Sequence, residues 1–118
     1  MDKVEQIFKR YERQAKTRNL TWRISIEEFE RLISRPCHYC GEYGDSEHAG
    51  FVGLDRVDNR IGYILTPVPN VVPACVECNF AKRVMVAHRF IDMCVRVAEH
   101  QKKIAEQKKT KLAEPVAA

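Results

Sequence analysis

The sequence predicts an α+β fold that is mainly helical, with a short-stranded core between flanking helices. Three observations support this prediction. Apolar residues recur at helical spacing near both ends, over residues 2–17 and 87–101. Residues 51–65 alternate in the manner of strands and contain a turn at 59–62. Two Cys-x-x-Cys pairs flank that region, and 118 residues suffice for one domain but not for two ordinary ones.

The cysteine spacing predicts a structural zinc site. Five cysteines would leave one thiol unpaired in a disulfide framework, whereas four of them form two Cys-x-x-Cys pairs, namely Cys37, Cys40, Cys75 and Cys78. Two unrelated thiol pairs or a redox dithiol are the alternatives. A four-sulfur site has no open coordination position, so we expect this zinc to do no chemistry. Zinc binding is worth about 10–16 kcal/mol, comparable with the stability of a whole domain, so we expect folding to require the metal.

The first third of the chain predicts two helices. Residues 2–17 carry one apolar stripe, made by Val4, Ile7, Phe8, Tyr11 and Ala15. Ser25 and Glu28 match a capping box, and the short helix that follows ends before Pro36. We expect Trp22 in the core. The lysines and arginines of the first helix indicate a solvated face, or phosphate contacts if the chain binds DNA.

The centre of the chain predicts a hairpin followed by a helix. Residues 51–58 match a strand and residues 63–65 match the strand that returns beside it. The pattern turns helical at Asn79. In the last helix, residues 87–101, Cys94 shares an apolar face with Phe90 and Val97, so we expect this thiol to be buried. Beyond residue 101 we expect a fraying helix and a disordered tail.

Composition restricts the class of protein only loosely. The net charge of +4 and the pI near 8.9 permit a polyanionic partner without requiring one. Apolar runs are too short to span a bilayer, and the charged start has no secretory signal region. We therefore expect a cytoplasmic location without membrane contact.

Several motifs together resemble the small HNH endonucleases associated with phages and mobile elements. The similarity runs from Tyr11 to about Ile91 and includes PCHYCG, GLDRVDN and NVVPACVECN, with Lys82 and Met85 after them. Any one of these motifs alone would be weak. The resemblance implies a ββα-metal core, a catalytic Mg²⁺ or Mn²⁺ distinct from the zinc, and cleavage of phosphodiester bonds in DNA. It also implies a location inside a bacterial host if the protein is phage-encoded.

The resemblance assigns roles to four residues. Asp55 matches the strand carboxylate that binds the catalytic ion, and Asn79 takes the position of a second ligand that is commonly histidine. Asn70 matches the asparagine that braces the hairpin loop. Lys82 lies one turn after Asn79 and can neutralise the scissile phosphate, although a solvated lysine is the simpler interpretation. Both metal ligands offer oxygen, which suits Mg²⁺ or Mn²⁺.

Arg56 departs from the family pattern. Typical members have a histidine there as the general base, whereas arginine keeps its proton and has no acceptor lone pair. It can still clamp a phosphate. Some relatives also carry Asp-Arg, so the change does not by itself predict inactivity. Tyr63, His48 and His88 are the candidate bases, and each also has an ordinary structural explanation.

Three functions compete, in decreasing order of support from the sequence. The first is a DNA endonuclease, with RNA an open alternative. The second is a catalytically weak or inactive zinc module that binds nucleic acid, and the third is a protein-interaction module that uses the last helix. Both a monomer and a homodimer are compatible with the sequence. We divide the chain into a helical segment (1–35), a zinc-containing ββα-metal domain (36–100) and a basic tail (101–118).

Overall fold

The computed structural model describes residues 2–113, which fall into two compact units that divide after Ala87. The first unit contains α1 (Lys3–Thr17), β1 (Trp22–Arg23), α2 (Ile26–Ile33), the short 3-10 helix η1 (Ser46–His48), β2 (Gly53–Arg56), β3 (Tyr63–Ile64), β4 (Val71–Ala74) and α3 (Val76–Lys82). The second contains nearly all of α4 (Ala87–Ala113). Among the described residues, none of these helices has the length and apolar character needed to cross a bilayer. The division into three domains stays a prediction.

Helices α1 and α2 begin at the residues that the sequence indicates. The Asp2 carboxylate accepts a hydrogen bond from the Glu5 backbone at 2.8 Å and caps α1. At α2, both bonds of the Ser25–Glu28 capping box are present. Satisfying the first amides in this way fixes where each helix starts, and hence which face turns inward.

Two small sheets replace the hairpin predicted for residues 51–65. Strand β2 pairs antiparallel with β4, with Leu54 opposite Pro73 and Asp55 opposite Val72. Strand β3, predicted as the return strand, instead pairs parallel with β1. Pro73 is tolerated in β4 because the Leu54 carbonyl opposite it accepts a hydrogen bond from Asn79 Nδ2 and needs no donor from position 73. The prediction of residues 63–65 as the return strand was therefore wrong, and the true return strand is β4, which follows Pro67 and Pro69.

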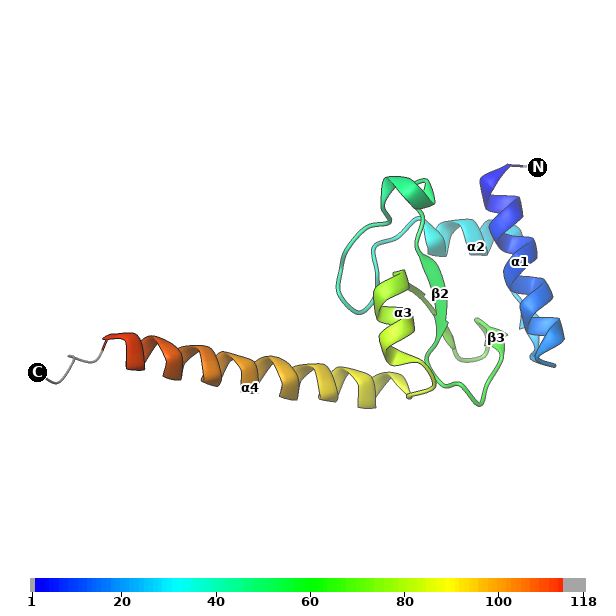
Figure 1. Ribbon diagram of the computed structural model, residues 1–118. Helices are drawn as coiled ribbons and strands as arrows, with labels where there is room; N and C mark the ends of the chain where they lie inside the picture. Colours follow the sequence, from blue (N-terminus) through cyan, green and yellow to red (C-terminus); the bar gives the residue numbers. More distant parts are fainter. Residues whose placement is uncertain (1, 114–118) are drawn as a thin grey trace, which may run out of the picture. The chain divides into compact units, whose positions relative to one another are not determined.

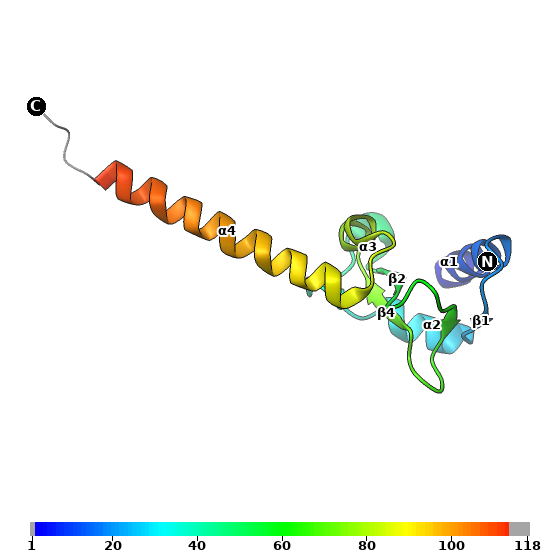
Figure 2. The same ribbon diagram turned by 90° about the horizontal axis from the view of Figure 1, so that it is seen from below.

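The core lies between α1, α2 and one face of β2. Leu54 is buried there with Phe29 and Ile33, and Trp22 packs against this core as expected. Successive residues of a strand face opposite ways, so Asp55 points to the other face, where Lys82 of α3 contacts it. Figures 1 and 2 show α3 lying beside β2. The β2–β4 pair thus carries an apolar face and a polar face.

The last two helices differ from their predicted boundaries. Helix α3 begins at Val76 rather than Asn79, because the Cys75 side chain caps it. Helix α4 continues past residue 101 to Ala113, and residues 114–118 of the expected tail lie outside the described part of the chain. Cys94 and Val97 are exposed, so the expectation that they are buried was wrong. Helical periodicity indicates an apolar face on a helix, but it does not determine whether that face is buried.

Replacing Tyr11 with phenylalanine tests the link between α1 and β2. The Tyr11 hydroxyl accepts the Leu54 amide at 3.2 Å, and burial raises the pKa of this phenol while that hydrogen bond lowers it. Tyr11→Phe should leave a buried amide unsatisfied and lower the free energy of unfolding by about 1–3 kcal/mol. Tyr43→Phe is the matched control, because Tyr43 is 72 % exposed. Urea unfolding that gives equal effects for both variants would contradict this link.

Candidate active site and zinc-binding cluster

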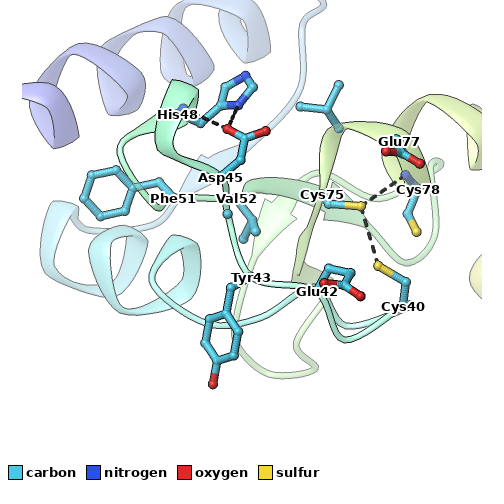
Figure 3. A pocket seen from close by; sticks show the side chains of 12 residues that line it. Cys40, Glu42, Tyr43, Asp45, His48, Phe51, Val52, Cys75, Glu77 and Cys78 are labelled. Atoms are coloured by element: carbon cyan, nitrogen blue, oxygen red, sulfur yellow. Dashed lines mark hydrogen bonds and ion pairs between the residues drawn. The ribbon is translucent and has the colours of Figure 1, made fainter.

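Four cysteine sulfurs lie together at one end of the β2–β4 pair. The Sγ atoms of Cys37, Cys40, Cys75 and Cys78 all lie within 4.8 Å of one another, and Cys40 Sγ is 3.7 Å from Cys75 Sγ. Sulfurs at about 2.3 Å from a tetrahedral zinc ion would be separated by about 3.8 Å. Figure 3 shows three of these sulfurs converging at the edge of a cavity of approximately 530 Å³. The cluster therefore fits a structural zinc site.

Strand β4 brings the two cysteine pairs together. Its carbonyl at Pro73 accepts the His38 amide at 2.8 Å, which holds the first pair against the strand. The second pair follows β4 directly, and Cys75 Sγ accepts the Cys78 amide at 3.4 Å. Gly41, with φ of +80°, allows the turn that closes the first pair. His38 is exposed, as expected for a residue outside the ligand set.

The thiols have the chemistry of a metal site. Burial raises the pKa of the Cys37 thiol, but hydrogen bonds from the Cys40, Cys75 and Tyr39 backbone outweigh it and lower the pKa to about 7. Burial raises the pKa of Cys75 and Cys78. Four sulfurs this close need a cation before all of them can ionise. A zinc ion would supply that charge and do no further chemistry in a closed four-sulfur site.

Asp55 is the centre of the second site, and it is only 4 % exposed. The Tyr39 hydroxyl donates to Asp55 Oδ2 at 2.6 Å. Lys82 Nζ lies 3.3 Å from Oδ1 and 3.2 Å from Oδ2. Burial raises the pKa of Tyr39, and the hydrogen bond to the Asp55 carboxylate raises it further, so the phenol keeps its proton. Both oxygens of the carboxylate are thus held in a fixed orientation.

The Lys82 side chain does not lie in solvent, as the simpler interpretation of the sequence expects. Its side chain is fully buried, and its ammonium also donates to the Arg56 carbonyl at 3.0 Å. A buried ammonium needs a negative partner, and Asp55 provides it. Lys82 therefore contacts Asp55 from inside the protein, between α3 and β2, and is not directed to solvent. Its predicted contact with a scissile phosphate remains a prediction.

Asp55, Arg56 and Asn79 line one surface hollow of approximately 420 Å³. Asn79 Nδ2 donates to the Leu54 carbonyl at 2.8 Å, which leaves the amide oxygen as the atom able to bind a cation. The Arg56 guanidinium lies 5.5 Å from the centre of the Tyr63 ring, and its Nη1 donates to the backbone of Asn59 and Ile61. A carboxylate and an amide oxygen form a donor set suited to Mg²⁺ or Mn²⁺.

Asn70 lies outside this hollow and holds the loop that precedes β3. Its Oδ1 accepts the Asp58 amide at 2.9 Å, and its Nδ2 donates to three carbonyls, those of Asp58, Ile61 and Gly62, at 3.0–3.1 Å. Because this loop also receives the Arg56 guanidinium, Asn70 helps to fix the position of that side chain.

The three candidate bases occupy different places. Tyr63 lines the hollow beneath Arg56. His48 is exposed, lies 2.6 Å from Asp45 and lines the cavity beside the cysteines (Figure 3). His88 is exposed on α4. Of the three, only Tyr63 contributes to the hollow that contains Asp55.

Sequence reasoning did not single out several residues that the structure brings to Asp55 or to the hollow. Tyr39 is the foremost, because it contacts the carboxylate directly. Its place between Cys37 and Cys40 was the available signal, since two metal ligands fix the backbone between them. Gln14, Arg18, Asn59 and Arg83 also line the hollow, and no sequence motif distinguishes them from ordinary surface residues.

Comparison with known proteins identifies the fold. No protein-family model matches the chain. The solved structure of the rare-cutting HNH restriction endonuclease PacI matches with a TM-score of 0.61 and 20 % sequence identity, over 87 % of this chain and 83 % of that one. The protein has an HNH-like fold. The predicted α+β, mainly helical architecture with a four-cysteine cluster is thereby confirmed, and the HNH resemblance is confirmed at the level of the fold.

A viral protein shares sequence with this HNH-like chain. Over 96 residues the chain is 34 % identical to an uncharacterized protein of Acanthamoeba polyphaga mimivirus. The match covers 80 % of this chain but only 17 % of the viral protein. It therefore links the HNH-like region to a segment of a much longer protein.

Removing one cysteine of the cluster should abolish zinc binding and folding together. The purified chain should contain one zinc ion, and Cys75→Ala should lose both the metal and the cooperative unfolding transition, since metal binding supplies folding energy. Cys94→Ala is the matched control, because that thiol is exposed outside the cluster. Elemental analysis and circular dichroism are the measurements, and a folded Cys75→Ala protein without zinc would contradict this expectation.

Asn70→Asp should destabilise the first unit by at least about 2 kcal/mol. The substitution keeps the shape but turns a carboxylate oxygen toward three carbonyl oxygens, and burial prevents water from compensating. Asn19→Asp is the same change at an exposed position and should cost less than about 1 kcal/mol. Chemical denaturation of the zinc-loaded proteins compares them, and equal losses would show that Asn70 is not a brace.

Proposed function

We propose that this protein is a divalent-metal-dependent endonuclease that hydrolyses phosphodiester bonds in DNA. One observation carries the proposal: the oxygen donors Asp55 and Asn79 line the same hollow as Arg56 on an HNH-like fold. The similarity to PacI, a restriction endonuclease, supports DNA as the substrate. A protein acting on DNA with reduced zinc-binding thiols is expected in the cytoplasm, including that of a phage-infected host.

The side chains around Asp55 would prepare it for a cation. When bound, Mg²⁺ or Mn²⁺ would polarise the phosphate and stabilise the leaving oxygen. Tyr39 and Lys82 hold the carboxylate in one orientation, so little reorganisation is needed at Asp55. Lys82 also places a positive charge beside Asp55. We infer that this charge weakens cation binding relative to an unpaired aspartate.

Arg56 would bind the substrate and not activate water. Its Nη1 is used by backbone carbonyls, whereas its Nε and Nη2 make no hydrogen bond within residues 2–113 and can donate to a phosphate oxygen. Because guanidinium has no acceptor lone pair, the base must be another group. The hollow also contains Arg18 and Arg83, so three guanidinium-bearing residues line it and an anionic backbone is a suitable ligand.

A specific observation favours the second function, a nucleic-acid-binding module without strong catalysis. Both oxygens of Asp55 already have partners within the chain, and arginine occupies the usual position of the base. Such a module would bind DNA in a salt-dependent manner, because neutralised phosphates release counterions. It would show no requirement for Mg²⁺ or Mn²⁺.

Asp55→Asn should reduce DNA cleavage by at least about a hundredfold, because the amide cannot hold the cation that stabilises the transition state. The measurement is nicking of supercoiled plasmid by the zinc-loaded full chain with Mg²⁺ or Mn²⁺. Asp45→Asn, an exposed carboxylate beside His48, is the control and should keep wild-type activity. Zinc content and circular dichroism establish that each variant is folded.

Each other outcome has a defined meaning. Cleavage that survives Asp55→Asn would place the activity elsewhere or in a contaminant. Absence of nicking by the wild-type chain with both metals, together with binding that weakens with salt, would support the non-catalytic module. Absence of nicking and of binding at low salt would overturn both and leave a protein-interaction role.

A further inference from the structure

One backbone turn of the first unit has a geometry that favours glycine, but it carries an arginine. The Met85 amide donates to the Lys82 carbonyl at 3.0 Å, which closes a four-residue turn at the end of α3. Arg83, the first central residue of this turn, has φ of 50° and ψ of −119°. These angles match a type II′ turn, in which glycine dominates this position because a Cβ atom is strained there.

Hydrogen bonds from neighbouring segments hold the turn in this conformation. The Asn59 side-chain amide donates to the carbonyls of Arg83 and Met85, at 3.3 Å in each case. Immediately after the turn, the Ala87 amide donates to the Val57 carbonyl at 3.0 Å. A glycine at position 83 would allow the same bonds, since the turn contributes only backbone atoms to them. These bonds therefore explain how the strain is maintained, but they do not explain why the residue is arginine.

The place of the Arg83 side chain supplies a reason. It lines the candidate active-site hollow together with Arg18 and Arg56. Its guanidinium lies 5.9 Å from the centre of the Phe80 ring, a cation–π distance that restricts its orientation without using its hydrogen-bond donors. Within residues 2–87, no carboxylate forms an ion pair with it. Three guanidinium groups around one hollow repel each other, so an anion bound there would be stabilised.

The strained backbone of Arg83 and the position of its side chain together indicate a functional residue. We propose that Arg83 binds a phosphate of the DNA backbone, and that the strained turn is kept because it brings the guanidinium to the hollow. Guanidinium suits this ligand because its planar donors match two phosphate oxygens. The identity of the anion rests on the proposed function. Arg83 is not among the residues to which the HNH resemblance assigns a role.

Two substitutions separate the effect of the side chain from that of the backbone. Arg83→Ala removes the guanidinium but keeps the Cβ atom and hence the strain, whereas Arg83→Gly removes both. Both variants should weaken binding to a labelled DNA duplex by about tenfold, and the slope of log affinity against log salt should fall by about one phosphate contact. Only Arg83→Gly should raise the urea midpoint of unfolding, because glycine adopts this φ without strain.

Arg35→Gly is the matched control, because Arg35 is exposed, lies outside the hollow and does not have a positive φ. It should lower the urea midpoint, since glycine there only adds freedom to the unfolded chain, and change DNA affinity by less than about twofold. Fluorescence anisotropy of the zinc-loaded full chain measures binding, without Mg²⁺ or Mn²⁺ so that the DNA stays intact. Circular dichroism in urea measures unfolding.

Three results would overturn the inference. The first is wild-type affinity and salt dependence in both Arg83 variants, which would leave DNA binding by the protein intact but remove Arg83 from it. The second is a lower urea midpoint for Arg83→Gly, as for Arg35→Gly, which would show that arginine is not strained in this turn. The third is a wild-type chain that does not bind DNA at low salt, which would overturn the proposed function as well.

Discussion

The convergence of four thiols on one point is the constraint on which the rest of the first unit depends. It connects residues that are 35 positions apart, Cys40 and Cys75, at the end of a sheet with only two strands. Such a sheet is too small to be stable alone. A single metal ion bound by the four thiols would hold together the loop before β2, the end of strand β4 and the start of helix α3. The polar face of β2 then has a helix against it, and Asp55 can be buried.

The sequence predicts the elements whose signals are local. The caps of α1 and α2, the apolar stripe of α1 and the cysteine set all depend on spacings of a few residues, and the structure contains them. The return strand was missed because pairing across a long loop has no local signal. Residues 63–64 have the composition of a strand and do form one, but with β1. Val71–Ala74 contains a proline, which argues against a strand unless the opposite carbonyl has another donor, as that of Leu54 has in Asn79 Nδ2.

The candidate site likewise contains residues that the sequence identifies and residues that it does not. Motif letters identify Asp55, Arg56 and Asn79, and the structure places these three around one hollow. The sequence motifs do not reveal that the Lys82 side chain is buried, because an isolated lysine on a helix is ordinarily solvated. Its burial depends on a tertiary contact with a carboxylate on a different element. The exposed thiol of Cys94 shows the opposite error: a periodic pattern identifies an apolar face but does not determine whether that face is buried.

The position of Tyr39 has a consequence for the zinc cluster. This residue stands between two ligands, Cys37 and Cys40, while its hydroxyl rests on Asp55. Tyr39 therefore connects the sulfur cluster to the carboxylate that faces the hollow. Oxidants that convert Cys37 and Cys40 to a disulfide would release the ion and shift the phenol at the same time.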